Sequence, residues 1–435
     1  MTWSLAILDD GVTNATQARA HKHTASEFDY YRNRADTDEG FADTHANRVF
    51  LSALSVSRSF EVVDLKVGAP ADRSFSYGFI EIGLAGLLAS PAGPVGAVNM
   101  SFGGPSYPVA FADEIGRLGE RGIIAVAASG NGGSRDTLES PSFPAALPNV
   151  IAVGSHDGDG NPSSFSRNGP GVAILADGED MPEAGSRGTS FAAPRVAATV
   201  THVQAIVQGL TGSTLDTAGM MDALRQGGAG PRSRPDPADG ETRYFLHDHA
   251  GSLDYAWSRY GGSPARALEY VASYADLIAA LHADPTAGRL HFERHGSVEE
   301  RAITFDGLDY IATYGDLIRA FGADGRAGSI HFIATGSREG RSTSFDGLDY
   351  IASYPDLILA FGAEHDAGSA HFIRSGWTEG RAPDLFDSAQ YLANYADLQA
   401  AFGSDEEAAT RHFIINGFAE GRTDDPLPAA TDFLV

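Results

Sequence analysis

Short apolar runs alternate with amphipathic stretches over the first 210 or so residues of the chain. The apolar runs lie at residues 5–9, 60–67, 96–102, 122–129, 149–155 and 171–176. Between them, apolar positions recur at helical spacing over residues 45–56, 77–90 and 110–122. This order of strand and helix predicts the α/β class, with a doubly wound, mostly parallel sheet that is covered on both faces. No GxGxxG sequence follows the first run, so a dinucleotide site is not predicted.

A second pattern follows residues 226–241, which are rich in Gly and Pro and are interpreted as a loop. Tyr and His then recur in four copies at steps of 40, 40 and 41 residues, namely Tyr270, Tyr310, Tyr350 and Tyr391, and His291, His331, His371 and His412. Each copy predicts two short helices broken by Gly, and therefore four helical hairpins over residues 264–424. Paired tyrosines such as Tyr350 and Tyr354 predict core packing on one helix face. The repeated His is more typical of a packed structural residue than of a metal ligand.

A third pattern surrounds Ser190. The stretch GSRGTSFAAPRV, residues 185–196, opens an apolar run that continues to residue 208 and predicts a helix buried on all sides. Pro194 fits the edge of the first turn of that helix. Ser190 is then either a cap for unpaired first-turn N–H groups or a nucleophile placed where these groups stabilise negative charge. The serine by itself does not decide between the two.

Composition excludes several classes of function. The chain has 435 residues, of which 43% are hydrophobic, so it has room for two or three globular domains. Its 31 Lys and Arg against 57 Asp and Glu give a formal charge of -26. Because this charge repels nucleic acid and anionic lipid, we expect no nucleic-acid partner, and the absence of a long apolar run predicts no membrane insertion. The chain has no cysteine, which excludes disulfides and thiolate metal sites.

Three further side chains match the needs of hydrolysis by a serine, which requires a base, an acid that orients the base, and a donor to the oxyanion. Asp9 ends the first apolar run, at the edge where doubly wound sheets place their sites. His45 opens a predicted helix, and Asn131 follows an apolar strand in a Gly-rich loop. Each residue alone has an ordinary structural role as a strand end, a helix start or a turn former. Together they predict catalysis by Ser190.

The order Asp, His, Asn, Ser, with these local sequences, resembles the subtilisin-like serine proteases over residues 1 to about 260. GTSFAAP at residues 188–194 matches the family pattern G-T-S-x-A-x-P at every position. VNMSFGG at 98–104 resembles the strand that holds the substrate backbone, and GSLDYA at 251–256 resembles the final strand. The resemblance implies a serine endopeptidase domain over residues 1–260, with a triad of Asp9, His45 and Ser190 and with Asn131 in the oxyanion hole. It also implies that substrate is bound by Ser101, Phe102, Gly103, Ala128, Ser129 and Gly130.

Two local sequences depart from the family pattern. Asp9-Asp10-Gly11 stands where the family has D-[ST]-G, and strand alternation favours Asp9 as the acid. Residues 45–49, HANRV, stand where the family has H-G-T-x-V, and His45 is favoured because Val49 then matches as well.

Other candidates for the base remain open. A register one turn earlier puts Ala42 at the position of the base and predicts an inactive protein. His21 and His23 compete with His45, but they lie in a polar stretch that no predicted helix follows.

The sequence also predicts where the protein works. Residues 425–435 form a tail that ends in Asp and three apolar residues, which resembles the export signal of bacterial proteases secreted by the type I route. The start of the chain lacks a secretory signal, so we expect type I secretion, with a cytoplasmic enzyme as the alternative. HDGDGN at 156–161 is more typical of a hairpin turn than of a calcium site, so no metal or other cofactor is expected.

The four repeats resemble modules of about 40 residues in large bacterial secreted or surface proteins. This resemblance implies that residues 264–424 bind a surface or a partner, or cap the catalytic domain. A second hypothesis is therefore a catalytically inactive, protease-like scaffold that acts as a binding protein. The preference of the specificity pocket depends on the shape of the loops at 101–107 and 128–133, which the sequence does not give.

Overall fold

The computed structural model of the protein describes residues 2–20, 22, 26–30, 44–69, 74–75, 77–89, 93–104, 109–133, 139–179, 186–236 and 240–427. The chain forms two compact units, of which the first comprises residues 1–263 and 290–302. The second unit comprises residues 264–289 and 303–435. Among the described residues, no helix is both long and apolar enough to cross a membrane.

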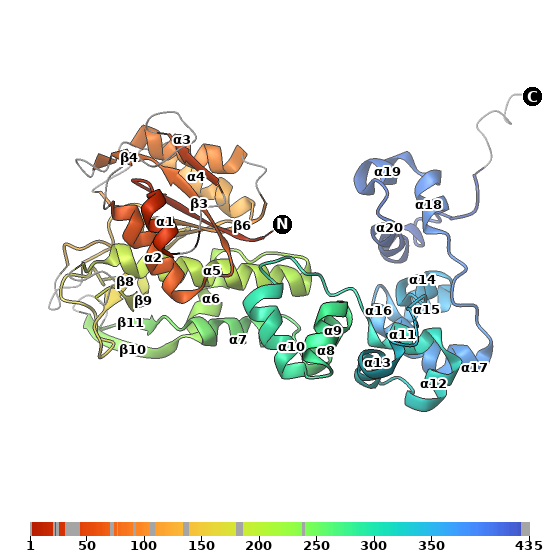
Figure 1. Ribbon diagram of the computed structural model, residues 1–435. Helices are drawn as coiled ribbons and strands as arrows, with labels where there is room; N and C mark the ends of the chain where they lie inside the picture. Colours follow the sequence, from red (N-terminus) through yellow and green to blue (C-terminus); the bar gives the residue numbers. More distant parts are fainter. Residues whose placement is uncertain are drawn as a thin grey trace, which may run out of the picture. The chain divides into compact units, whose positions relative to one another are not determined.

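The first unit is built on a nine-stranded sheet with the strand order β10-β11-β9-β8-β7-β6-β1-β3-β2 (Figure 1). The strands are β1 (Ser4–Asp9), β2 (Ser26–Asp29), β3 (Glu61–Lys66), β6 (Val95–Met100), β7 (Ile124–Ala128), β8 (Val150–His156), β9 (Val172–Asp177), β10 (Ala229–Asp236) and β11 (Gly240–Leu246). Every pair in this sheet is parallel except β10 with β11. The predicted α/β fold with a mostly parallel sheet is confirmed. A small second sheet pairs β4 (Gly68–Ala69) with β5 (Ser74–Phe75).

The helices of the first unit include all those predicted from apolar spacing. They are α1 (Asn14–Ala20), α2 (His45–Val56), α3 (Tyr77–Ala89), α4 (Val109–Glu120), α5 (Thr189–Thr211), α6 (Thr217–Gly227) and α7 (His249–Arg259). α5 packs against α2 and against β6, β7 and β8, and it is buried along most of its length, as its apolar sequence predicts. Its N-cap is Gly188, which supplies no side chain, so Ser190 lies inside the helix and is not its cap.

Pro194 is the sixth residue of α5 and lies in its second turn, just beyond the first turn to whose edge the sequence assigned it. A proline there has no N–H to donate to the carbonyl of Ser190, four residues earlier. That carbonyl instead accepts a hydrogen bond of 2.7 Å from Ser101 Oγ. The proline therefore frees a carbonyl that joins the start of α5 to the end of β6.

Two predicted elements are wrong. Residues 226–241, predicted to be a loop, contain β10 and lead into β11, which form an antiparallel pair. β10 lies at the edge of the sheet, where prolines are tolerated because their missing N–H groups are not needed by a second neighbour. Residues 251–256, predicted to be the final strand, lie in α7, where Asp248 caps the helix and Ser252, Leu253, Ala256 and Trp257 are buried at helical spacing.

Many helices follow in the second part of the chain. They are α8 (Pro264–Ala272), α9 (Ala275–Leu281), α10 (Pro285–His291), α11 (Gly307–Thr313), α12 (Gly315–Phe321), α13 (Gly325–His331), α14 (Gly347–Ala352), α15 (Pro355–Phe361), α16 (His365–His371), α17 (Trp377–Glu379), α18 (Ser388–Asn394), α19 (Ala396–Phe402) and α20 (Glu406–His412). One π-helical turn follows the third helix of each copy, namely η1 (Phe292–Gly296), η2 (Phe332–Gly336), η3 (Phe372–Gly376) and η4 (Phe413–Gly417). The first, second and fourth copies thus have three short α-helices and a π turn, and the third adds α17, where two-helix hairpins were predicted.

The break within each predicted first helix falls at its second tyrosine. Tyr354 has an extended backbone and is the N-cap of α15, and its counterparts in the other copies cap α9, α12 and α19 in the same conformation. Tyr350 and Tyr354 therefore lie on different helices, although their rings still pack edge to face at 5.5 Å between centroids. Tyr350 is fully buried, as are its counterparts in the other copies. Its hydroxyl lies 3.1 Å from Nδ1 of His371, so this histidine is packed and hydrogen-bonded.

The first unit includes one segment that lies beyond the predicted boundary near residues 260–264. Residues 290–302, from the first sequence copy, belong to the first unit. Phe292 and Val298 are fully buried there. The ring of Phe292 packs against Trp257 at 5.5 Å, and the carbonyl of Val298 accepts a hydrogen bond of 2.7 Å from the N–H of Trp3. The core of the first unit is therefore completed by a segment that follows its last strand by more than 40 residues.

Candidate active site

Asp9 and His45 lie in contact at the carboxyl end of β1. Asp9 is the last residue of that strand and is fully buried. Its carboxylate oxygens lie 3.0 and 3.1 Å from Nδ1 of His45, the first residue of α2. Thr44 caps α2 by accepting a hydrogen bond from the N–H of Asn47, which fixes the start of the helix at His45. The competing candidates His21, His23 and Ala42 lie outside the described residues.

Asp10 binds the start of the helix that carries His45. Its carboxylate accepts hydrogen bonds of 2.7 Å from the N–H of Ala46 and 3.2 Å from the N–H of His45, two first-turn donors that have no partner within the helix. Burial and the charge of Asp9 raise the pKa of Asp10 to about 6, against the lowering effect of these hydrogen bonds. The two aspartates thus bind different parts of the same segment. Asp9 binds the imidazole of His45, and Asp10 binds the backbone N–H groups of His45 and Ala46. Strand alternation in the sequence gave no sign of the second role.

Ser190 lies where the end of β6 meets the start of α5. Its Oγ donates a hydrogen bond of 3.1 Å to the carbonyl of Ser101, and Ser101 Oγ donates in return to the carbonyl of Ser190. The ring of the next residue, Phe191, lies 5.6 Å from the imidazole of His45 between centroids. The starts of α2 and α5 therefore bring His45 and Ser190 to the same side of the sheet.

Asn131 is held against the start of α5 in a defined orientation. Its Oδ1 accepts hydrogen bonds from the N–H and the hydroxyl of Thr189, at 2.8 and 2.9 Å. Because the carbonyl oxygen of the amide is used in this way, Nδ2 is its donor side. A Cβ atom at Gly188 would lie 3.1 Å from this Nδ2, so glycine at 188 leaves the amide room beside Ser190.

A cavity of about 570 Å³ opens beside Ser190. It is lined by Ser101, Phe102, Gly103, Gly104, Ala128, Gly130, Asn131, Pro141, Ser142, Phe143, Arg167, Thr189 and Ser190. Five of the six predicted substrate-binding residues are among these, and Ser129 is the exception. Its side chain is fully buried and donates a hydrogen bond of 2.7 Å to the carbonyl of Arg167, so it supports the cavity from behind. Sequence reasoning missed residues 141–143 and Arg167, which reach the cavity from distant segments.

Residues 156–161, weighed above as a calcium site, form a tight turn. The carboxylate of Asp157 accepts hydrogen bonds from the backbone N–H groups of Asp159 and Asn161, at 3.1 and 2.9 Å. Gly160 has a φ of 78°, which L side chains rarely adopt. Asp157 Oδ1 is thus engaged by the backbone of its own turn.

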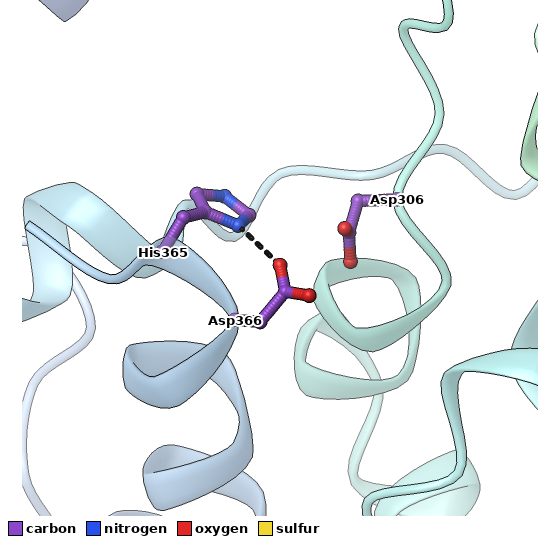
Figure 2. Close-up of side chains that lie close together, drawn as sticks. All are labelled: Asp306, His365 and Asp366. Atoms are coloured by element: carbon purple, nitrogen blue, oxygen red, sulfur yellow. Dashed lines mark hydrogen bonds and ion pairs between the residues drawn. The ribbon is translucent and has the colours of Figure 1, made fainter. Parts of the chain in front are cut away.

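Another group of possible metal ligands lies in the second unit, where Asp306, His365 and Asp366 converge (Figure 2). His365 Nδ1 lies 3.2 Å from Asp366, and Nε2 lies 3.0 Å from Asp309. Burial lowers the pKa of His365, but these two carboxylates outweigh it and raise the pKa well above its ordinary value. His365 thus links α16 to α11 through its contact with Asp309.

Comparisons with known proteins identify sequence relatives of this chain. The sequence pattern of the subtilase family matches residues 2–242. Subtilisin DY of Bacillus licheniformis is 37% identical over 107 residues, which are 23% of this chain and 39% of that protein. Subtilisin BL of Lederbergia lenta is 33% identical over 158 residues, which are 34% of this chain and 54% of that protein. The chain thus spans about half the length of these relatives or less.

Two solved structures are also similar to part of this chain. The crystal structure of a lanthipeptide protease matches with a TM-score of 0.48 and 17% identity, over 58% of this chain and 86% of that one. The crystal structure of a cold-adapted subtilisin-like serine proteinase matches with a TM-score of 0.46 and 22% identity, over 56% of this chain and 87% of that one.

Proposed function

The chain belongs to the subtilase family, and on that basis we propose that it is a serine endopeptidase acting on protein or peptide substrates. The observation that carries this proposal is the contact of 3.0 Å between Asp9 and His45 Nδ1. This contact places an oriented imidazole beside the helix that begins with Thr189 and Ser190.

The roles follow from this arrangement. His45, with Nδ1 bound by Asp9, takes the proton of Ser190 Oγ through Nε2 as Oγ attacks the carbonyl carbon of the scissile peptide bond. Asp9 stabilises the imidazolium that results. His45 then gives its proton to the leaving amine, and a water molecule repeats the sequence on the acyl-enzyme. Ser190 Oγ has to exchange its present acceptor, the carbonyl of Ser101, for His45 when substrate binds.

The negative oxygen of the tetrahedral intermediate needs two donors. The backbone N–H of Ser190 belongs to the first turn of α5, where N–H groups have no partner within the helix. Asn131 supplies Nδ2 as the second donor, and Thr189 fixes its orientation through Oδ1. Fixed donors of this kind are what electrostatic stabilisation of the transition state requires.

Hydrolysis of an internally quenched peptide by the full chain tests the proposal. Ser190→Ala and His45→Ala should each lower kcat by about 10⁴-fold or more, because the triad acts as a unit. Asn131→Ala should lower kcat by about 10²–10³-fold with little change in KM, the range known for the oxyanion asparagine of subtilisin. Ser213→Ala removes an exposed hydroxyl and serves as the matched control. Equal turnover by His45→Ala and the wild type would overturn the proposal.

Type I secretion and partner binding by residues 264–424 stay predictions from the sequence. Residues 428–435, which include the apolar end of the tail, lie outside the described residues. Export of the full chain and of a variant lacking residues 432–435, from a host with a type I transporter, tests the first prediction.

A further inference from the structure

We propose that the cavity beside Ser190 selects an acidic side chain, so that the enzyme cleaves after Glu or Asp, and that Arg167 is the residue that sets this preference. The inference rests on the proposed function. It adds the chemical class of the substrate residue that precedes the scissile bond.

The position of the cavity determines which part of the substrate enters it. Ser190, which attacks the carbonyl carbon, and Asn131, which binds the carbonyl oxygen, both line its wall. The side chain of the residue that supplies this carbonyl is attached one bond away from the reacting carbon. The other walls are residues 101–104 after β6, Ala128 and Gly130 at the end of β7, and residues 141–143. The cavity is therefore the space for this side chain.

Among the described residues that line the cavity, Arg167 alone carries a charge. Its side chain crosses Gly130, the residue before Asn131. A Cβ atom at Gly130 would lie 2.9 Å from Arg167 Cδ, and one at Gly132 would lie 3.5 Å from Arg167 Nη2. Glycine at 130 and 132 thus makes room for the arginine stem and its guanidinium beside the oxyanion donor.

Arg167 is held in place before substrate arrives. Its backbone N–H donates a hydrogen bond of 2.9 Å to the carbonyl of Gly130, and its own carbonyl accepts one of 2.7 Å from Ser129 Oγ. Nη1 donates to the carbonyl of Ser140 at 3.0 Å, which fixes the guanidinium. An arginine that is already oriented loses less entropy when it binds a carboxylate, and its planar fork fits two carboxylate oxygens.

Glu139 modulates this charge from outside the cavity. Its Oε2 lies 3.6 Å from Arg167 Nη2, beyond the ordinary length of a charged hydrogen bond, and the two side chains are 37% and 34% exposed. Such a partly solvated pair is weak. A guanidinium has five N–H donors, so a substrate carboxylate can share it with Glu139 or displace that residue. A Lys or Arg side chain of the substrate would instead meet a like charge.

Apolar side chains are the competing occupants, because Phe102, Ala128, Pro141 and Phe143 also line the cavity. The net charge of -26 acts against acidic substrates as a whole and has to be separated from the local preference. The test therefore varies only the residue before the scissile bond. The rest of the peptide keeps one sequence with a small positive charge, and the ionic strength is fixed.

The experiment measures kcat/KM of the full chain for peptides with Glu, Asp, Gln, Leu, Phe or Lys before the scissile bond. Glu should exceed the neutral isostere Gln by roughly 10- to 100-fold, the effect expected of a hydrogen-bonded charge pair. Arg167→Met should bring the Glu-to-Gln ratio near one and leave the Leu peptide within a few-fold of wild type. Glu139→Gln should raise the ratio. Arg117→Met removes an equal charge from an exposed site on α4, paired with Glu114, and should leave the ratio unchanged.

The outcomes separate the inference from the function on which it rests. Preferred cleavage after Leu, Phe or Lys by the wild type overturns the acidic preference and leaves the peptidase standing. An unchanged Glu-to-Gln ratio in Arg167→Met overturns the role of Arg167. Absence of cleavage in the whole panel overturns the proposed function itself. The wild-type panel decides the preference even if Arg167→Met fails to fold.

Discussion

Acidification should destabilise the first unit through a group of enclosed histidines. His202 on α5 is fully buried, and its ring lies 5.2 Å from that of His249 between centroids. Thr199 Oγ1 lies 2.7 Å from His247 Nε2 and 2.9 Å from His249 Nδ1. Burial, together with neighbouring positive charge, lowers the pKa of His202 and of His247 to about 3, and that of His249 to about 4.

The sign of the effect follows from linkage. Because these histidines stay neutral in the folded state, the unfolded chain binds protons first as the pH falls below about 6.5. The stabilisation is therefore complete above pH 6.5 and is lost as the pH falls toward the folded pKa values. Each group loses about 1.4 kcal/mol per pH unit, or about 2 kcal/mol between pH 6.5 and pH 5.

The net loss of stability on acidification is smaller than three fully buried histidines would give. His247 and His249 are only partly enclosed, so together they contribute at most about 4 kcal/mol over this range. Asp10 acts in the other direction, because its raised pKa of about 6 returns about 1.4 kcal/mol between pH 6 and pH 5. The net loss is about 1–5 kcal/mol, a large share of the roughly 5–15 kcal/mol that stabilises a typical domain.

Urea unfolding of the full chain at pH 7 and pH 5 measures this loss. Ser190→Ala as a background prevents self-digestion. With Trp377 of the second unit replaced by Phe, the fluorescence of Trp3 and Trp257 reports on the first unit. His202→Gln should reduce the pH-dependent loss by about 2 kcal/mol, because it removes a buried titrating group. His282→Gln, at an exposed site in the second unit, is the control. An identical loss in His202→Gln and the wild type would refute the reasoning, since it would mean that His202 binds its proton in the fold.

Three further changes test other parts of the account. Asp10→Asn should lower kcat several-fold with little effect on KM, because the start of α2 loses an anionic acceptor. In denaturation experiments this substitution should lower the free energy of unfolding more at pH 5 than at pH 8. The reason is that the raised pKa of Asp10 makes its protonated form the one that stabilises the fold. Gly130→Ala should destabilise the first unit by about 1–3 kcal/mol in thermal unfolding, because φ is 111° at this residue and the added Cβ would meet the Arg167 side chain. The control Gly116→Ala adds a Cβ that meets no atom within 4 Å, so it should be neutral or stabilising. A fragment of residues 1–302 should give a cooperative unfolding transition and cleave peptides, whereas a fragment of residues 1–262 should aggregate, because it lacks the buried Phe292 and Val298.

The sequence was sufficient to predict strands and helices where the local pattern of apolar residues agrees with the tertiary environment. Central parallel strands are buried on both faces, so β1, β6, β7 and β8 read as continuous apolar runs. α5 reads as a helix because almost every side chain along it is small or apolar. The positions of Asp9, His45 and Ser190 were predictable because each lies at the end of such an element.

Sequence reasoning failed where the environment overrides local preference. The prolines of β10 predicted a loop, but an edge strand tolerates them. Residues 251–256 resemble a family strand, but their apolar positions recur at helical spacing and they lie within α7. Arg167 and Asp10 gave no signal, because their importance depends on contacts with residues about 36 positions away, Gly130 and Ala46. These pairs of residues come into contact only when the chain has folded.

Labelling of the full chain with a fluorophosphonate probe, located by mass spectrometry, tests the central claim most directly. The probe bonds covalently to a serine only when a base activates its hydroxyl and an oxyanion hole binds the phosphonyl oxygen. The account predicts that the wild type is labelled at Ser190 alone, and that His45→Ala and Asp9→Asn, folded by circular dichroism, are labelled far more slowly. Folded wild-type protein that stays unlabelled, or equal labelling of wild type and His45→Ala, would contradict it.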